Sequence, residues 1–270
     1  MFDLHYAPEN WGVRPTLFSL FGIDVPSYGF FVALGLIVGG LWYWHEARKE
    51  KQANENTFLI GVAAIIGGAF GAKLLELIIN PAYVIAHFTD PEALLSGRTI
   101  IGGLLGGWLA VRAAKHWLGI EGRRGNLFAP AVALGVTVGR IGCFFRGCCY
   151  GTPTSMPWGV DFGDGIARHP TMIYEALFTF GLFLYLLHRK RGHPAPGALF
   201  TEFLNGYFTF RFFVEFIRVE PQFWGLSVFQ WISLAALAFI NWQSIRRLFS
   251  PRNKSDKANY IRRKIGQKRR

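Results

Sequence analysis

The residues best suited to chemistry concentrate in one short stretch, GRIGCFFRGCCYGT, which runs from residue 139 to residue 152. It contains all three cysteines of the chain and two arginines: Cys143, Cys148, Cys149, Arg140 and Arg146. Thiols this close together allow a nucleophile, a disulfide or a metal site. The C-x4-C-C spacing is not a usual zinc spacing, and only His169 offers an obvious fourth ligand, so no metal is expected. Two states stay open for the thiols: a disulfide from Cys143 to Cys148 or Cys149 on an oxidising outer face, or three unmodified thiols.

A second group of polar residues interrupts an apolar segment, NGYFTFRFFVEFIRVEP, at 205–221. Its members recur at i, i+4, i+8 and i+11: Tyr207, Arg211, Glu215 and Arg218. On a helix this spacing places all four on one face. An internal salt bridge, such as Arg211 with Glu215, would explain them structurally. Alternatively they form an anion site, because the planar guanidinium group bonds two phosphate oxygens at once.

The elements that carry these residues are predicted to be membrane helices. The chain is 51% hydrophobic and 16% aromatic, and its apolar runs approach the roughly 20 residues that cross a bilayer as a helix. The prediction is an all-α, polytopic membrane protein with seven spans: 27–44, 58–79, 100–118, 127–145, 171–188, 198–217 and 226–245. Residues 1–26 form an outer-face segment without the features of a cleavable signal peptide, 27–245 the seven-helix domain with an outer loop at 146–170, and 246–270 a basic tail.

The placement of basic residues predicts the orientation of these spans. The net charge is +12, and Lys and Arg gather after the first, third, fifth and seventh spans. Because basic loops favour the cytoplasm, the N-terminus is expected outside and the C-terminus inside. The basic tail is interpreted as a segment attracted to anionic lipid, and nucleic acid is not an expected partner.

Charged residues predicted within spans are functional candidates, because an ionised group in the bilayer costs about 2.5–3.5 kcal/mol. They are Arg140, Glu175, Glu202, Arg211 and Glu215. Arg140 and Arg211 show no clear excess of acid beside them, which favours a bound phosphate or lipid headgroup.

Glycines and one histidine complete the candidates. Gly67 and Gly71 are interpreted as helix-packing residues, whereas Gly102 and Gly103 have a second interpretation as backbone that contacts a headgroup. His169 precedes a proline at the entry to a predicted helix, and is interpreted either as a titrating group or as a cap.

Five ordered blocks of the chain resemble the prolipoprotein diacylglyceryl transferase family. They are SYGFF (27–31), FAPAVALGVTVGRIGCFFRG (128–147), RHPTMIYEAL (168–177), GYFTFRFFVEFIRVEP (206–221) and GLSVFQWISL (225–234). The resemblance implies transfer of a diacylglyceryl group from phosphatidylglycerol to the thiol of a lipobox cysteine, with glycerol phosphate leaving. It implies a bacterial plasma (inner) membrane location, a site toward the outer face, a cysteine-containing protein acceptor and no cofactor.

The resemblance also assigns roles to residues. Arg140 and Arg211 would hold the phosphate and stabilise its charge. Tyr28, Tyr207, Glu215 and Arg218 would shape the headgroup site, together with Gly102 and Gly103. The acceptor thiol must also lose its proton, since the thiolate is the nucleophile, and His169 is a candidate replacement base that the resemblance does not itself assign.

This chain departs from the family pattern at two places. The family usually has a histidine before the Gly-Gly of the third span, where this chain has Ile101. The Asn of the Gly-Arg-x-Gly-Asn-Phe motif is Cys143, and Arg146, Gly147 and Cys148 replace the Asn-Gly-Glu that follows. The residues of the pattern that would bind phosphate are kept, whereas some of those that would take part in the reaction are replaced.

Three functions are compatible with these departures. The first is a divergent transferase, with His169 or the arginine field activating the acceptor, or with Cys148 or Cys149 as a nucleophile that carries a lipid intermediate. The second is a lipid-binding or transporting protein without transferase chemistry. The third is a thiol-based redox membrane protein.

Overall fold

A computed structural model describes residues 11–79, 81, 99–120, 122 and 124–242 of the 270-residue chain. The helices are α1 (Ser27–Lys49), α2 (Glu55–Ile79), α5 (Ile100–Trp117), α6 (Gly125–Arg146), α7 (Thr171–Lys190), α8 (Ala198–Val214), the 3-10 turn η1 (Glu215–Ile217) and α9 (Val228–Ile240). The strands are β1 (Thr16–Leu20), β2 (Ile23–Pro26), β3 (Val160–Asp161), β4 (Ala167–Arg168), β5 (Gln222–Phe223) and β6 (Leu226–Ser227). The basic tail at 246–270 lies outside the described residues.

Each of the seven predicted spans coincides with an α-helix in the described part of the chain. Four of these helices, α1, α2, α6 and α7, are long and apolar enough to cross a membrane. The last helix is shorter than its predicted span, because α9 ends at Ile240 and Asn241 caps it. An α-helical membrane protein is therefore confirmed, whereas the number of crossings and their direction stay predictions.

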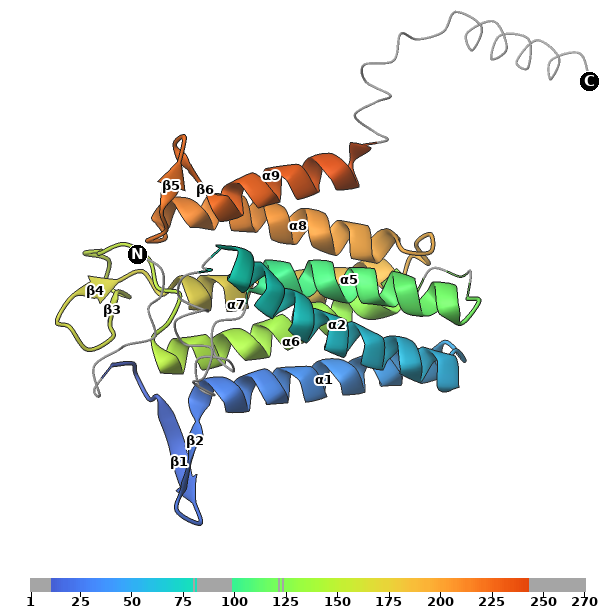
Figure 1. The fold of residues 1–270 in the computed structure, drawn as a ribbon, viewed down its shortest axis with the longest axis horizontal. Coiled ribbons are helices and arrows are strands. Elements are labelled where there is room, and N and C mark those ends of the chain that lie inside the picture. Colours follow the sequence, from blue (N-terminus) through green and yellow to red (C-terminus); the bar gives the residue numbers. More distant parts are fainter. Residues whose placement is uncertain (1–10, 80, 82–98, 121, 123, 243–270) are drawn as a thin grey trace, which may run out of the picture.

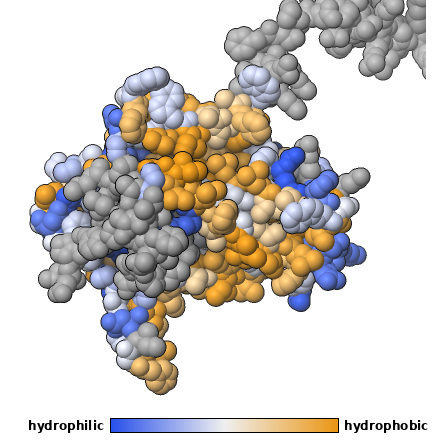
Figure 2. Space-filling model, in the orientation of Figure 1, coloured by the Kyte–Doolittle hydropathy of each residue, from blue (hydrophilic) through white to orange (hydrophobic). Residues whose placement is uncertain are grey.

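The helices pack side by side, and the irregular structure gathers at one end of the bundle (Figure 1). This hairpin end contains three two-stranded antiparallel hairpins, β1–β2, β3–β4 and β5–β6. It also holds the start of α1 and α7 and the end of α6 and α8 (Figure 1). Figure 2 shows apolar residues gathered across the middle of the bundle and hydrophilic residues toward both ends, as a bilayer requires.

The opposite end of the bundle, here the basic end, carries the positive loops. Lys190 of α7 forms ion pairs with Glu46 and with Glu50, the latter at 2.6 Å, so the ends of α7 and α1 meet there. Arg124 donates a hydrogen bond to Thr57, which joins the starts of α6 and α2. The ends of α1 and α7 and the starts of α2 and α6 therefore meet at this end, as in an up-and-down arrangement of neighbouring helices.

Glycines let α2 and α5 approach within backbone contact distance. A Cβ atom added to Gly71 would lie 2.5 Å from the carbonyl oxygen of Gly102, and one added to Gly67 would lie 2.1 Å from the Cβ of Ala110. A Cβ added to Gly106 would lie 2.3 Å from the carbonyl oxygen of Gly67. The prediction that Gly67 and Gly71 serve helix packing is confirmed, because only the hydrogen of glycine fits this interface.

The start of α9 has a local explanation in the sequence. Ser227 Oγ accepts a hydrogen bond from the Gln230 backbone N–H at 3.2 Å, and Gln230 Oε1 accepts one from the Ser227 N–H at 2.8 Å. This capping box satisfies two backbone donors at the beginning of the helix. Gln230 Nε2 also donates to the Phe212 carbonyl oxygen at 3.2 Å, which joins α9 to α8 close to the site described next.

Candidate active site at the hairpin end

A buried ion pair between α6 and α7 forms the centre of the candidate site. Arg140 Nη2 lies 2.6 Å from Glu175 Oε2, and the two side chains are 7% and 1% exposed. Arg140 lies in the last two turns of α6 and Glu175 in the first turns of α7, so the loop between these helices brings the two residues together. The sequence marks both as charges inside predicted spans, and the structure shows that they neutralise each other.

The polar face predicted for 205–221 packs against this pair. Tyr207 Oη donates a hydrogen bond to Glu175 Oε1 at 2.9 Å. Arg211 Nη1 lies 3.7 Å from Glu175 Oε2, while Arg211 Nη2 lies 3.0 Å from Glu215 Oε2. Tyr207, Arg211 and Glu215 are 0%, 4% and 3% exposed, so the prediction that they share a buried face is confirmed.

Arg218 extends the cluster beyond the end of α8. Its Nε lies 3.5 Å from Glu215 Oε2, and its Nη2 lies 3.0 Å from Glu220 Oε1. Its Nη1 donates to the Cys149 carbonyl oxygen at 2.8 Å, which ties the segment after η1 to the loop after α6. Burial raises the pKa of Glu220, and the charge of Arg218 opposes that shift.

The charges of this cluster balance. Arg140, Arg211 and Arg218 lie within 4 Å of three carboxylates: those of Glu175, Glu215 and Glu220. The expectation of no clear excess of acid beside Arg140 and Arg211 agrees with this balance, although the packing of α6, α7 and α8 brings Glu175 to both arginines. The salt bridge considered as a structural explanation, Arg211 with Glu215, is present.

Hydrogen bonding in the cluster is nevertheless incomplete. Among the described residues, no acceptor bonds Arg140 Nε, Arg211 Nη1 or Arg218 Nε, and no donor bonds either carboxylate oxygen of Glu215. Buried polar atoms without a partner cost about 1–3 kcal/mol each, more for charged groups. Three unbonded guanidinium N–H donors on three neighbouring arginines are suited to an anion that offers several oxygens, such as a phosphate.

The cysteines lie beside this cluster at the end of α6. Helix α6 stops at Gly147, whose left-handed φ of 75° lets the Gly147 and Cys148 N–H groups both donate to the Cys143 carbonyl oxygen. Arg140 Nη1 donates to Cys143 Sγ at 3.7 Å. All three cysteines are within the described residues, and no disulfide joins any two of them.

The two cysteines in the loop have opposite electrostatic surroundings. Hydrogen bonds from the Cys143 and Cys148 thiols, helped by the charges of Arg218 and Arg140, hold the pKa of Cys149 well below its ordinary value. Donating those bonds to its neighbours, and burial, raise the pKa of Cys148. Of these two cysteines, Cys149 therefore ionises more readily than Cys148.

His169 occupies a different part of the hairpin end. Its Nδ1 lies 3.1 Å from Tyr174 Oη, which also accepts a hydrogen bond from Trp158 Nε1 at 2.8 Å. The described contacts of the His169 side chain thus place it with the outer-loop aromatics, whereas Glu175, the residue after Tyr174, faces Arg140. The interpretation of His169 as a cap is not borne out, because Pro170 is the N-cap of α7 and no side-chain hydrogen bond caps the helix. The His169 carbonyl oxygen accepts from the Gly151 and Thr171 N–H groups, and its titrating role stays a prediction.

The remaining predicted site residues divide between two surroundings. Tyr28 packs with the cysteine group, and the Arg146 guanidinium lies 5.3 Å from its ring centroid. Gly102 and Gly103 face α2, where added Cβ atoms would lie 2.4 Å from the Gly71 carbonyl oxygen and 3.5 Å from that of Gly68. Their contact with a headgroup stays a prediction. Ile101 is 2% exposed and belongs to the apolar core that includes Tyr207.

Sequence reasoning named Glu175 as a functional candidate but gave it no role in the site, although the Tyr-Glu of the RHPTMIYEAL block contains it. The signal was its position as an unexplained acid at the start of an apolar helix. Glu202, which carries the same signal, lies at the basic end and pairs with Arg189 at 2.8 Å in a partly exposed ion pair. Glu175 and Glu202 differ in burial, and burial is a property of the folded chain.

Comparison with known proteins agrees with this geometry. The family model described as prolipoprotein diacylglyceryl transferase matches residues 15–245. The phosphatidylglycerol–prolipoprotein diacylglyceryl transferase of Clostridium tetani is 35% identical over 82% of this chain and 93% of its own length. The corresponding proteins of Clostridioides difficile and Cupriavidus pinatubonensis are 32% and 35% identical, over 80% and 82% of this chain and 88% and 86% of their own lengths. With its buried arginines in the family's motif positions and a match over most of its length, the chain belongs to the prolipoprotein diacylglyceryl transferase family.

Proposed function

We propose that this protein transfers the diacylglyceryl group of phosphatidylglycerol to the cysteine thiol of a prolipoprotein, at the hairpin end of the bundle. The observation that carries the proposal is the set of unbonded N–H donors on Arg140, Arg211 and Arg218. Relatives at 30–35% identity are named as transferases that use phosphatidylglycerol and prolipoprotein, and these names supply the lipid donor and the class of the acceptor.

The arginines would act on the phosphate of the lipid donor. The acceptor thiolate attacks the glyceryl carbon that bears the phosphate ester, a C–S bond forms, and the C–O bond breaks. The electron pair of that bond leaves on glycerol phosphate, whose negative charge grows as the bond breaks. Donors fixed in a dry site stabilise such charge without reorganising, and removal of one costs about a hundredfold to a thousandfold in rate.

The carboxylates would keep these donors in place. Glu175 holds Arg140 on one side and Arg211 on the other, and Glu215 holds Arg211 and Arg218. Without the lipid, the arginines are neutralised by these acids and the cluster stays buried. When a phosphate enters, the unbonded N–H groups are the ones free to turn toward it.

Direct transfer to the acceptor accords better with the chemistry than a lipid intermediate on Cys148 or Cys149. Attack by either cysteine on the glyceryl carbon would produce a thioether. A second transfer would then have to expel a thiolate from a saturated carbon, which is a far poorer reaction than loss of glycerol phosphate. The cysteines are therefore not assigned as lipid carriers.

The proposed orientation places the hairpin end on the outer face of a bacterial plasma membrane, with all seven helices crossing the bilayer. The support is the position of basic residues at the opposite end: Arg48, Lys49, Arg112, Arg124, Arg189 and Lys190. The N-terminus would then be outside and the C-terminus inside.

One observation favours a second candidate, a lipid-binding protein without transferase chemistry. Ile101, at the position of the family's usual histidine, is buried among apolar side chains and offers no proton acceptor. This candidate predicts that phosphatidylglycerol binds through the arginines without any turnover.

The deciding experiment incubates the purified protein with phosphatidylglycerol vesicles and a lipobox peptide. Mass spectrometry follows the peptide, and an enzymatic assay follows glycerol phosphate. Transfer predicts equal amounts of lipidated peptide and glycerol phosphate, reduced about a hundredfold or more in Arg140→Gln. The matched control is Arg189→Gln, which removes an arginine of the exposed pair at the basic end and should retain activity. Lipid binding with no product in the unaltered protein would contradict transfer and support the second candidate.

A further inference from the structure

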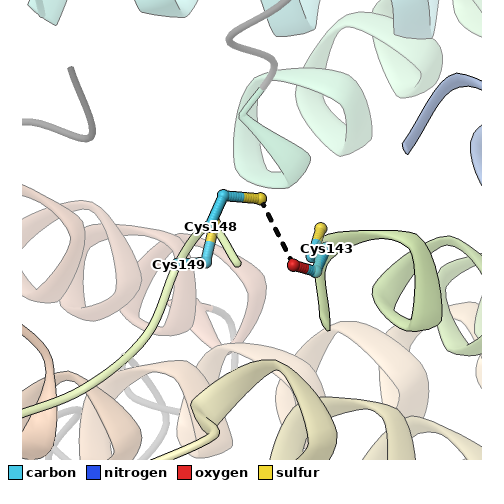
Figure 3. A group of neighbouring side chains, drawn as sticks. All are labelled: Cys143, Cys148 and Cys149. Carbon is cyan, nitrogen blue, oxygen red and sulfur yellow. Dashed lines mark hydrogen bonds between the residues drawn. The ribbon is translucent and has the colours of Figure 1, made fainter. Parts of the chain in front are cut away.

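The three cysteines form a compact cluster of sulfur atoms. Their Sγ atoms all lie within 4.8 Å of one another. Figure 3 shows Cys143 on the last turn of α6 and Cys148 and Cys149 on the loop that follows, with the Cys148 side chain directed toward Cys143. Cys143 and Cys148 are each 6% exposed, and Cys149 is partly exposed.

The backbone adopts an unfavourable conformation that keeps this cluster together. Cys149 has a φ of 65°, in the left-handed region that non-glycine residues rarely adopt. Such a residue costs about 1–3 kcal/mol and persists when its surroundings hold it. Here Arg218 Nη1 and Thr171 Oγ1 both donate hydrogen bonds to the Cys149 carbonyl oxygen. These contacts are of the supporting kind that fixes the ligands of metal sites.

Two arginines lie beside the sulfurs. Arg140 Nη1 donates to Cys143 Sγ at 3.7 Å, and Arg218 is bound to the backbone of Cys149. Their positive charges can offset the negative charge of thiolate ligands around a bound cation. The carboxylates of Glu175 and Glu215 pair with the arginines, so no acid competes directly for a cation among the sulfurs.

We propose that Cys143, Cys148 and Cys149 together bind one Cu(I) ion through their three sulfur atoms. The site lies beside Arg140 and Arg218 of the proposed transfer site, but the transfer reaction itself requires no metal. On binding, thiols that are still protonated release their protons to solvent, as thiolate ligation requires. The ion stays in the Cu(I) state, so no oxidant or reductant takes part.

The number and kind of ligands select this ion. Thiolates are soft ligands that favour Cu(I), Zn²⁺ and iron–sulfur clusters. Zn²⁺ and iron sites are usually completed by a fourth protein ligand. Among the described residues, no histidine, aspartate or glutamate joins the three cysteines as a fourth ligand. Cu(I) accepts three sulfurs alone, and the three thiolates with Cu(I) carry two negative charges beside Arg140 and Arg218.

The distances are compatible with such an ion. Metal–thiolate bonds of about 2.3 Å, the Zn–S length, hold three sulfurs about 4 Å apart in a plane. The sulfurs already lie within 4.8 Å of one another, so rotation about the Cα–Cβ bonds supplies the remaining approach.

The test uses the full-length protein in detergent micelles, reduced and kept free of oxygen. Cu(I) is added against the coloured Cu(I) chelator bathocuproine disulfonate, and metal content is measured after desalting. One copper per chain with three sulfur neighbours in X-ray absorption supports the proposal. Cys143→Ser, Cys148→Ser and Cys149→Ser should each weaken Cu(I) binding at least about tenfold, the smallest loss expected when even a supporting residue is removed.

The matched control is Met156→Leu, which removes an exposed soft ligand of the same loop and should leave Cu(I) binding unchanged. If a serine variant does not fold, reversible blocking of the unaltered protein with methyl methanethiosulfonate applies the same test. Absence of bound copper, two sulfur neighbours instead of three, copper retained by all three variants, or tighter retention of Zn²⁺ than of Cu(I) would each overturn the proposal. None of these results bears on lipid transfer, which is measured separately.

Discussion

Arg140 and Glu175 form a buried ion pair, with Arg140 Nη2 2.6 Å from Glu175 Oε2, that joins the end of α6 to the start of α7. Glu175 also accepts a hydrogen bond from Tyr207 and lies 3.7 Å from Arg211. One carboxylate therefore positions two of the three arginines that the proposed reaction uses. The pair is also a liability, because loss of either partner leaves an uncompensated buried charge.

Replacement of Glu175 by glutamine should damage both stability and transfer. Glutamine keeps the size and an acceptor for Tyr207, but it leaves Arg140 and Arg211 without their shared anion. Breaking a buried pair in this way costs about 3–5 kcal/mol. The melting temperature in detergent and the rate of peptide lipidation measure the two effects. Glu202→Gln, at the partly exposed pair with Arg189, should cost at most about 1 kcal/mol and serves as the control. Equal effects of the two variants would contradict the role assigned to Glu175.

Introduction of histidine at position 101 should destabilise the protein without raising the transfer rate. Ile101 belongs to the apolar core that includes Ala129, Ala133 and Phe203, where an imidazole would replace an aliphatic side chain among mostly apolar neighbours. An unsatisfied buried polar group costs about 1–3 kcal/mol. The melting temperature of Ile101→His is compared with that of Ile101→Leu, which keeps the apolar volume. A higher rate of peptide lipidation in Ile101→His would show instead that a side chain at this position still acts on the reacting groups.

Addition of a single methyl group at Gly71 should separate α2 from α5. Its Cβ would lie 2.5 Å from the Gly102 carbonyl oxygen, a distance that real Cβ atoms essentially never show. Overpacking of this kind costs about 1–3 kcal/mol. Gly181→Ala in α7 is the matched control, because an added Cβ there has no heavy atom of the described residues within 4 Å beyond its own turn. Thermal melting should fall for Gly71→Ala and stay level or rise for Gly181→Ala, since alanine favours a helix.

The reactivity of Cys149 should persist to lower pH than that of an ordinary thiol. Its pKa is lowered, so Cys149 retains a larger fraction of thiolate below pH 8 than a thiol of ordinary pKa, about 8.5. As the pH falls through the lowered pKa, the thiolate and the reaction are lost. Iodoacetamide labelling of metal-free protein, followed by peptide mass spectrometry at several pH values, measures this profile.

The double variant Cys143→Ser, Cys148→Ser provides the comparison for that profile. It weakens the hydrogen bonds that lower the Cys149 pKa, so labelling near pH 6 should slow while labelling near pH 9 stays similar. Arg218 and Arg140 remain, and the shift should therefore be partial. A profile centred on an ordinary thiol pKa in the unaltered protein would contradict the lowered pKa of Cys149.

Much of the architecture follows from local features of the sequence. Apolar runs near 20 residues determine the helices, because a helix satisfies its own backbone hydrogen bonds wherever it lies. The i, i+4, i+8 spacing of Tyr207, Arg211 and Glu215 likewise places them on one face, since helical periodicity depends on nothing outside the helix. Glycine pairs such as Gly67 and Gly71 likewise predict close helix packing, because residues four apart lie on the same face of a helix.

Tertiary structure decided which charges meet. Glu175 lies far from Arg211 in sequence, and no periodicity within α7 indicates that it neutralises Arg140 and Arg211 together. The pairing depends on how α6, α7 and α8 pack, and it produces a balanced cluster with unbonded donors. The β3–β4 and β5–β6 hairpins were missed because two-residue strands carry too little pattern to be recognised, and the longer β1–β2 hairpin lies in the segment 1–26 that was assigned no strands.

The cysteines also divide into what the sequence determines and what the tertiary structure decides. Their order along GRIGCFFRGCCYGT is read directly from the chain, and it indicated neither a usual metal spacing nor a single disulfide. Only the left-handed turns at Gly147 and Cys149 bring the three sulfurs within 4.8 Å of one another beside Arg140. Residue types set which chemistry is available, whereas the distances that select among the alternatives exist only in the folded chain.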